Sequence, residues 1–127
     1  MPTAVTEGVR VTVESMYLAD RSAPDEGSYA FAYHVTIANE GSERVRLMRR
    51  HWIITDGNGR VEEVEGPGVV GQQPVLAPGE EHHYSSGAVL VTPVGTMEGT
   101  YEMVADGGRV FKADIPRFAL QVPGILH

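Results

Sequence analysis

The alternation of apolar and polar residues with a period of two is the feature that most constrains the fold of this chain. It is clearest in residues 9–13 and 31–37, where every second residue is apolar. Because successive side chains of a β-strand point to opposite faces, such segments bury one face and expose the other. No stretch carries the 3.6-residue period of an amphipathic helix. The sequence therefore predicts an all-β protein.

Seven strands are expected from this pattern, separated by turn-forming segments such as residues 39–42 and 56–59. They cover residues 9–18, 29–38, 44–55, 60–64, 81–91, 99–105 and 109–115, with a short extension at residues 118–122. In the third strand the apolar positions change parity between Leu47 and Trp52. A strand changes face in this way only through an irregularity, so a β-bulge is predicted at residues 48–51.

Strands at this spacing, with no crossover helix between them, bury one face each when two antiparallel sheets pack together. We therefore expect a single domain over residues 1–127, folded as an immunoglobulin-like or fibronectin type III-like antiparallel β-sandwich. The chain has no cysteine, which excludes disulfides, thiolate metal sites and an antibody-type domain. Tyr101 is the candidate for the tyrosine corner found in such sandwiches.

Charge and hydropathy exclude two classes of partner. The formal net charge of −7 argues against a nucleic-acid partner, since broad contact with phosphates needs a basic surface. No apolar run approaches the roughly 20 residues that cross a bilayer, so no membrane association is expected. The first residues lack the basic and apolar regions of a signal peptide. A cytoplasmic location is predicted.

An ordered series of short segments runs through residues 30–120. These segments are Arg50-His51-Trp52-Ile53-Ile54-Thr55-Asp56, Gly68-Val69-Val70-Gly71-Gln72-Gln73-Pro74, Leu76-Ala77-Pro78-Gly79, Tyr84-Ser85-Ser86-Gly87, Gly95-Thr96-Met97-Glu98-Gly99-Thr100-Tyr101-Glu102-Met103 and Ile115-Pro116-Arg117-Phe118. In this order and spacing they resemble the ApaG family. The family often has Glu where this chain has Gln72.

The resemblance implies a fibronectin type III-like sandwich and a stand-alone bacterial protein. Related eukaryotic domains accompany F-box modules and DNA-polymerase-associated proteins, which implies recruitment of other proteins. Bacterial members are linked to cobalt and magnesium handling and to a neighbouring diadenosine tetraphosphatase. The resemblance implies no reaction for the domain itself, and we expect neither an enzyme nor a cofactor.

Gly66-x-Gly68-x-x-Gly71 matches the dinucleotide-binding pattern, in which backbone N–H groups and a following helix hold a pyrophosphate. Here Pro74 and Pro78 prevent that helix, and the intervening proline at position 67 has no N–H to donate. Residues 66–79 are therefore expected to form an irregular loop between strands. A nucleotide or polyphosphate held by Arg46, Arg50 and this loop stays open as an alternative function.

A protein-interaction module is the leading hypothesis. Its binding surface would comprise Arg46, Arg50, His51, Trp52, Gly66, Gly68, Val69, Val70, Gly71 and Gln72. Trp52 is the only tryptophan and is expected to pack in the core. The alternative to core packing is a groove in which Trp52 or Val69-Val70 receives an apolar side chain of the partner. Arg50 would then orient a carboxylate.

The basic run at residues 44–51 has two interpretations. Arg44, Arg46 and Arg50 share one face of an unbroken strand, where they could bind an anion. Alternatively, the run is a solvated face that forms cross-strand ion pairs with the glutamates at positions 62, 63 and 65.

The histidines and serines offer weaker candidates for chemistry. The five histidines are His34, His51, His82, His83 and His127. Adjacent residues of a strand point to opposite faces, so positions 82 and 83 are not expected to hold one ion together, and no metal site is predicted. Ser85 and Ser86 precede a glycine and are expected to bond to nearby backbone in a bend. We expect no nucleophile there.

Overall fold

The computed structural model describes residues 1–124. Its strands are β1 (Thr3–Thr6), β2 (Val9–Tyr17), β3 (Tyr29–Asn39), β4 (Val45–Asp56), β5 (Val61–Pro67), β6 (Val75–Leu76), β7 (Glu81–Leu90), β8 (Val94–Ala105) and β9 (Val110–Gln121). Two 3-10 turns, η1 (Ala19–Arg21) and η2 (Pro24–Glu26), lie between β2 and β3. None of the helical segments in this described part is long and apolar enough to span a membrane.

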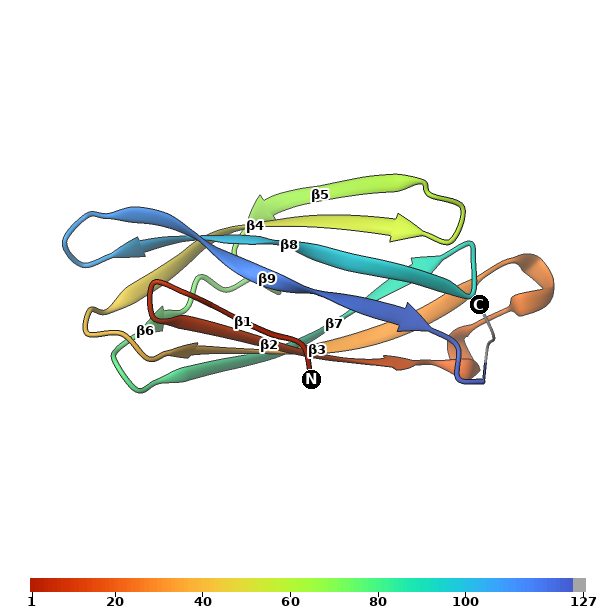
Figure 1. Ribbon diagram of the computed structural model, residues 1–127, viewed down its shortest axis with the longest axis horizontal. Coiled ribbons are helices and arrows are strands. Elements are labelled where there is room, and N and C mark those ends of the chain that lie inside the picture. The colour runs from red at the N-terminus through yellow and green to blue at the C-terminus, as the bar shows by residue number, and fades with distance from the viewer. Residues whose placement is uncertain (125–127) are drawn as a thin grey trace.

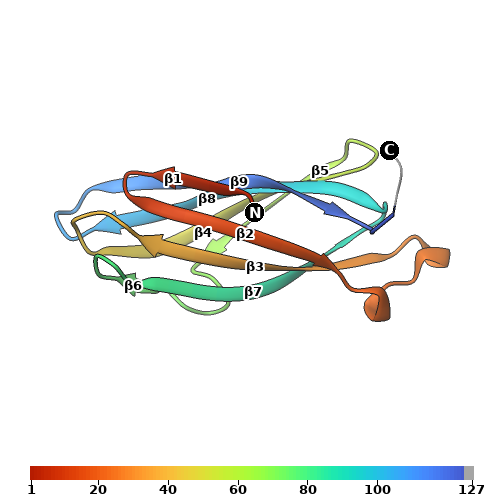
Figure 2. The ribbon, with the colours of Figure 1, turned by 60° about the horizontal axis from the view of Figure 1, so that its bottom comes forward.

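The strands form two antiparallel sheets that pack face to face, as Figures 1 and 2 show. One sheet has the order β1-β2-β3-β7 and the other the order β5-β4-β8-β9, with β6 added to β4. Each sheet buries one face against the other, which gives the alternating burial seen along β2 and β3. The predicted fibronectin-like sandwich is confirmed.

Two short strands lie outside the seven that were expected. β1 is an edge strand with no fully buried residue, and β6 has only two residues, so neither carries a strong alternating pattern. β1 lies between the two sheets at one side, where the Asp114 N–H donates to Thr6 Oγ1 at 3.0 Å. These strands extend the predicted sandwich without changing its architecture.

The last two strands are longer than predicted because β8 begins at Val94 and β9 continues through Pro116. The register between them shifts between Met97 and Gly99, opposite Pro116. A proline cannot donate to the ladder and is tolerated in a strand at such a bulge. The expected break after residue 115 is therefore a local irregularity within one strand.

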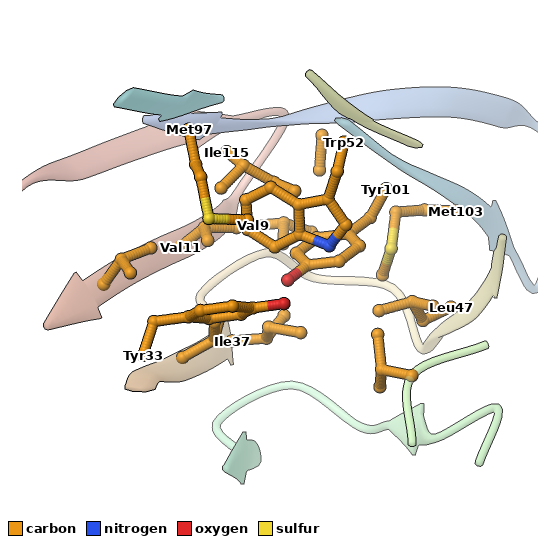
Figure 3. Close-up of a cluster of buried hydrophobic side chains, with 14 of the residues drawn as sticks. Val9, Val11, Tyr33, Ile37, Leu47, Trp52, Met97, Tyr101, Met103 and Ile115 are labelled. Atoms are coloured by element: carbon orange, nitrogen blue, oxygen red, sulfur yellow. The ribbon is translucent and has the colours of Figure 1, made fainter. Parts of the chain in front are cut away.

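Trp52 lies in the centre of the core with 3% of its surface exposed (Figure 3). Its ring lies 5.2 Å from that of Tyr33, on the facing sheet, and 6.0 Å from that of Phe118, on its own sheet. Tilted aromatic pairs at such distances contribute about 0.5–1.5 kcal/mol each beyond the burial of their area. The expectation that Trp52 packs in the core is confirmed.

The predicted bulge in β4 is confirmed, since the register with β8 shifts between Leu47 and Arg49. After the bulge, Arg50 pairs with the fully buried Tyr101 and so faces the core side of the sheet, like Trp52. Arg46 lies outward beside buried neighbours. The common outer face that an unbroken strand would give to Arg46 and Arg50 is therefore absent.

Tyr101 does not form a tyrosine corner, which requires a hydroxyl bonded to upstream backbone. Its hydroxyl instead pairs with that of Tyr84 on the opposite sheet. Burial raises the pKa of Tyr101 well above its ordinary value and raises the pKa of Tyr84 in the same direction. The two phenols therefore form a neutral polar bridge inside the sandwich.

Candidate functional site

The glycine-rich loop leaves β5 at Pro67 and returns to the sheet at Val75, the first residue of β6. Its tip is a two-residue hairpin: the Val69 N–H donates to the Gln72 carbonyl at 2.8 Å, and the Gln72 N–H donates back at 3.0 Å. The φ angles of Val70 and Gly71 are 46° and 76°. Positive φ at both central residues defines a type I′ turn. We refer to residues 69–72 as the loop tip.

The loop is fastened to the bulge of β4. The carbonyl of Met48 accepts the Gly68 N–H at 2.9 Å and the Gln73 side-chain amide at 3.0 Å. Arg46 Nη2 in turn donates to Gln73 Oε1 at 3.1 Å. A bulge leaves backbone groups outside the regular ladder, and here one of them anchors the loop.

Arg50 holds the other side of the loop. Its Nη1 donates to the carbonyls of Pro67 and Gly68 at 2.9 and 3.0 Å. A Cβ at Gly66 would lie 3.0 Å from both Nη atoms of this guanidinium, so glycine provides the room for the arginine to pass. Arg50 therefore positions the loop instead of presenting a free charge to a carboxylate.

Gly68 is required by close packing within the loop. Its φ is +61°, and a Cβ there would lie 2.2 Å from the Gln72 carbonyl oxygen. The N–H groups of Gly68, Val69 and Gln72 all donate to carbonyls of the chain. Because the dinucleotide pattern needs such groups to be free for phosphate, this geometry favours a structural role for the glycines.

Of the two valines in the loop tip, one is buried and the other is exposed. Val69 is 1% exposed, whereas Val70 is 65% exposed beside the exposed Gly71 and Gln72. Of the residues suggested to receive a partner's apolar side chain, Trp52 or Val69-Val70, only Val70 is exposed, because Trp52 and Val69 are buried in the core. Since neighbouring residues of an extended segment face opposite ways, sequence alone did not indicate which valine is outside.

Two members of the basic run at residues 44–51 pair with acidic side chains. Arg44 pairs with Asp106 at 3.1 Å. His51 Nε2 lies 2.8 Å from Glu63 and 3.7 Å from Glu65, which confirms the predicted cross-strand pairing for this histidine. Arg46 and Arg50 instead bond to neutral groups of the loop. Such exposed pairs contribute about 0–1 kcal/mol each.

A second exposed apolar region lies between the start of β5 and the end of β7. Val61, Val89 and Val91 line a hollow of about 300 Å³ there. All three valines are more than half exposed. The region provides a comparison surface for the loop tip, since Val89 is exposed to nearly the same extent as Val70, at 68%.

Sequence reasoning missed a histidine pair on the outer face of the other sheet. His34 of β3 and His83 of β7 face each other with ring nitrogens 3.3 Å apart. His82 lies on the opposite face, as expected from alternation, and His127 lies outside the described residues. Within residues 1–124, no three His, Asp or Glu side chains converge to hold a metal ion.

Ser85 does not bond to local backbone as predicted. It lies in the middle of β7, with its hydroxyl 2.9 Å from His34 Nδ1. Acyl transfer also needs donors that stabilise an oxyanion. β3 lies between β2 and β7, so its N–H groups are used in the ladders on both sides. The pair alone therefore does not make a hydrolytic site.

Comparison with known proteins gives a consistent result. The family model described as the ApaG domain matches residues 19–105. Protein ApaG of Pseudomonas fluorescens (strain Pf0-1) is 58% identical over 119 residues, which cover 94% of each chain. Protein ApaG of Aromatoleum aromaticum is 52% identical over 124 residues, covering 96% of this chain and 98% of that protein. A crystal structure of an ApaA protein from Bordetella pertussis superposes with a TM-score of 0.90 at 48% identity, covering 98% of both chains.

Proposed function

The chain belongs to the ApaG domain family, and from that premise we propose that it is a non-enzymatic module that binds a protein partner through the loop tip. The observation that carries the proposal is the conformation of Val70. This β-branched residue is held at a φ of 46° while most of its side chain faces solvent. Residues held in sparsely populated conformations cluster at functional sites.

Burial offsets only part of the strain at Val70, because the side chain is 65% exposed. A left-handed conformation costs a residue with a Cβ about 1–2 kcal/mol. Asparagine or glycine would fit this turn position better, yet an apolar side chain is displayed there. A partner pocket that receives Val70 would give this displayed side chain a role.

The base of the loop supports the same role. Arg46, Arg50 and Gln73 fasten the loop to β4 on two sides. A surface that is already ordered loses little conformational entropy on binding, so more of the contact energy is retained as affinity. The exposed part of the tip, Val70 to Gln72, contains no acidic or basic side chain. This composition suits an apolar contact better than proton transfer.

The test compares the same substitution at two valines. Val70→Asp should reduce affinity for the partner at least tenfold, because it places a charge in an apolar contact. Val89→Asp is the matched control and should leave the affinity unchanged. Val69→Asp is unsuitable, since a buried charge would unfold the domain.

The partner is first identified by capture on the wild-type chain from an extract of the producing cells, and its affinity is then measured with both purified proteins by calorimetry. Equal affinities for wild type and Val70→Asp would refute the proposal. Loss at Val89→Asp alone would assign the interface to the hollow between β5 and β7.

The alternative of a nucleotide or polyphosphate ligand has less support, because the guanidinium groups of Arg46 and Arg50 already bond within the chain. Titration with ATP and with diadenosine tetraphosphate at millimolar concentration should give no saturable heat. A saturable signal that disappears in Arg46→Ala would replace the protein-partner proposal with ligand binding.

A further inference from the structure

The outer face of the β1-β2-β3-β7 sheet carries a connected series of polar side chains that the loop tip does not involve. In register, His34 lies opposite Ser85, and Thr36 lies opposite His83. Side chains of paired residues lie on the same face of a sheet, so these four form one patch across β3 and β7. Glu81 lies two positions before His83 in β7 and therefore on the same face of the strand.

In each histidine of this patch, one ring nitrogen contacts a serine or glutamate side chain. His34 Nδ1 lies 2.9 Å from Ser85 Oγ, and His83 Nε2 lies 3.2 Å from Glu81 Oε2. Because an ionised carboxylate only accepts hydrogen bonds, the neutral tautomer of His83 that matches Glu81 has its proton on Nε2 and a lone pair on Nδ1. The other two ring nitrogens, His34 Nε2 and His83 Nδ1, lie 3.3 Å apart, and the Thr36 hydroxyl lies 3.1 Å from the same His83 nitrogen.

This separation is the one that a tetrahedral metal ion requires. Bonds of about 2.0–2.1 Å at a tetrahedral angle place two ligand nitrogens about 3.3–3.4 Å apart. Metal-bound histidines commonly donate their other N–H to a carboxylate or another oxygen, which fixes the ring and its tautomer. Glu81 and Ser85 occupy those positions here.

We propose that His34 and His83 form a two-histidine site for a divalent transition-metal ion such as Zn²⁺, Ni²⁺ or Cu²⁺. The protein supplies two neutral imidazoles, and water fills the remaining coordination positions. Imidazole nitrogen suits these ions, whereas Mg²⁺ prefers an oxygen shell. The position on an exposed face makes the ion exchangeable, in contrast to a buried structural site.

The proton balance of binding follows from the side-chain partners. Without metal, His34 Nε2–H donates to His83 Nδ1, and His34 Nδ1 accepts from the Ser85 hydroxyl. On binding, the His34 proton moves to Nδ1, which then donates to Ser85 Oγ. The lone pairs of His34 Nε2 and His83 Nδ1 then bind the ion. Neither neutral histidine changes its net charge.

The test is titration of Zn²⁺ into the chain without a histidine tag, in a buffer that does not chelate metal. We expect one saturable site by calorimetry. His34→Ala and His83→Ala should each weaken binding at least tenfold. His82→Ala is the matched control, because this neighbouring histidine of β7 lies on the other face of the strand and should leave the affinity unchanged. Circular dichroism of each variant checks that the strands carrying these three positions stay folded.

A second variant examines the orienting carboxylate. Glu81→Gln should weaken binding by about tenfold, the lower end of the effect of removing a carboxylate that supports a metal-bound histidine. Absence of saturable Zn²⁺ binding would overturn the proposal, as would equal affinities of wild type and His34→Ala, or a loss in His82→Ala as large as that in His83→Ala. Broadening of amide signals by Cu²⁺ around residues 34 and 83, and not around the loop tip, would confirm the location.

Discussion

Replacing Val70 by asparagine should stabilise the domain. Val70 and Gly71 occupy the two central positions of a type I′ turn, where an Asn-Gly pair is strongly preferred. Removing a β-branched residue from the left-handed region recovers about 1–2 kcal/mol. Against this, about a third of the valine surface is buried, and its loss costs about 0.5–1 kcal/mol by the usual value for a buried valine. The midpoints of these two ranges differ by about 0.75 kcal/mol, which is the expected net gain in the free energy of unfolding.

Urea denaturation measures this gain, with the fluorescence of Trp52 as the signal because it is the only tryptophan and is buried. The midpoint should rise while the slope with urea stays unchanged, since the surface exposed on unfolding is nearly the same. Val89→Asn is the control: asparagine is a poor strand residue, so this variant should lose up to about 1 kcal/mol.

The same variant separates stability from binding. If the loop tip binds the partner, Val70→Asn lowers the affinity at least tenfold even though the domain becomes more stable. An unchanged or lower free energy of unfolding for Val70→Asn would refute the strain argument. That outcome would mean that the valine is compensated within the free domain and offers no reason to assign a partner to it.

Three further predictions concern the core and the loop. Tyr101→Phe should lower the free energy of unfolding by about 1–3 kcal/mol, because it leaves the Tyr84 hydroxyl without its partner. The double variant with Tyr84→Phe should lose less than the sum of the two single variants, and additive losses would contradict the pairing. Gly71→Ala should lower the free energy of unfolding by about 1–2 kcal/mol because of its positive φ alone, and Gly68→Ala should lower it more because its Cβ meets the Gln72 carbonyl. Equal losses of the two variants in urea titrations would refute that close approach. Burial raises the pKa of Tyr84 and Tyr101 above the value near 10 of the unfolded chain. Their contribution to stability is therefore fully present below about pH 10 and is lost as the pH rises toward the raised values. The variant with phenylalanine at both positions should lose less of its free energy of unfolding at alkaline pH.

Much of the fold follows from patterns that lie within single strands. The alternation at residues 9–13 and 31–37 predicted which side chains are buried, and the change of parity between Leu47 and Trp52 predicted the bulge. These features depend on the period of one extended chain, which is two residues whatever the strand pairs with. β1 and β6 lacked such a pattern, so they could be found only through their neighbours in the sheets.

The candidate sites depend on contacts between segments distant in sequence. The bulge was predicted, yet only the packed sheet shows that it turns Arg50 toward the core and frees the Met48 carbonyl for the loop. The conformation of one tight turn decides that Val69 is buried and Val70 exposed.

The sequence by itself determined an all-β sandwich, the buried positions of its clearest strands and its family, because period, composition and ordered motifs can be read along one chain. Only the tertiary structure decided that His34 meets His83, 49 residues away. The register of β3 against β7 makes that contact, and register is set by the packing of both sheets as a whole.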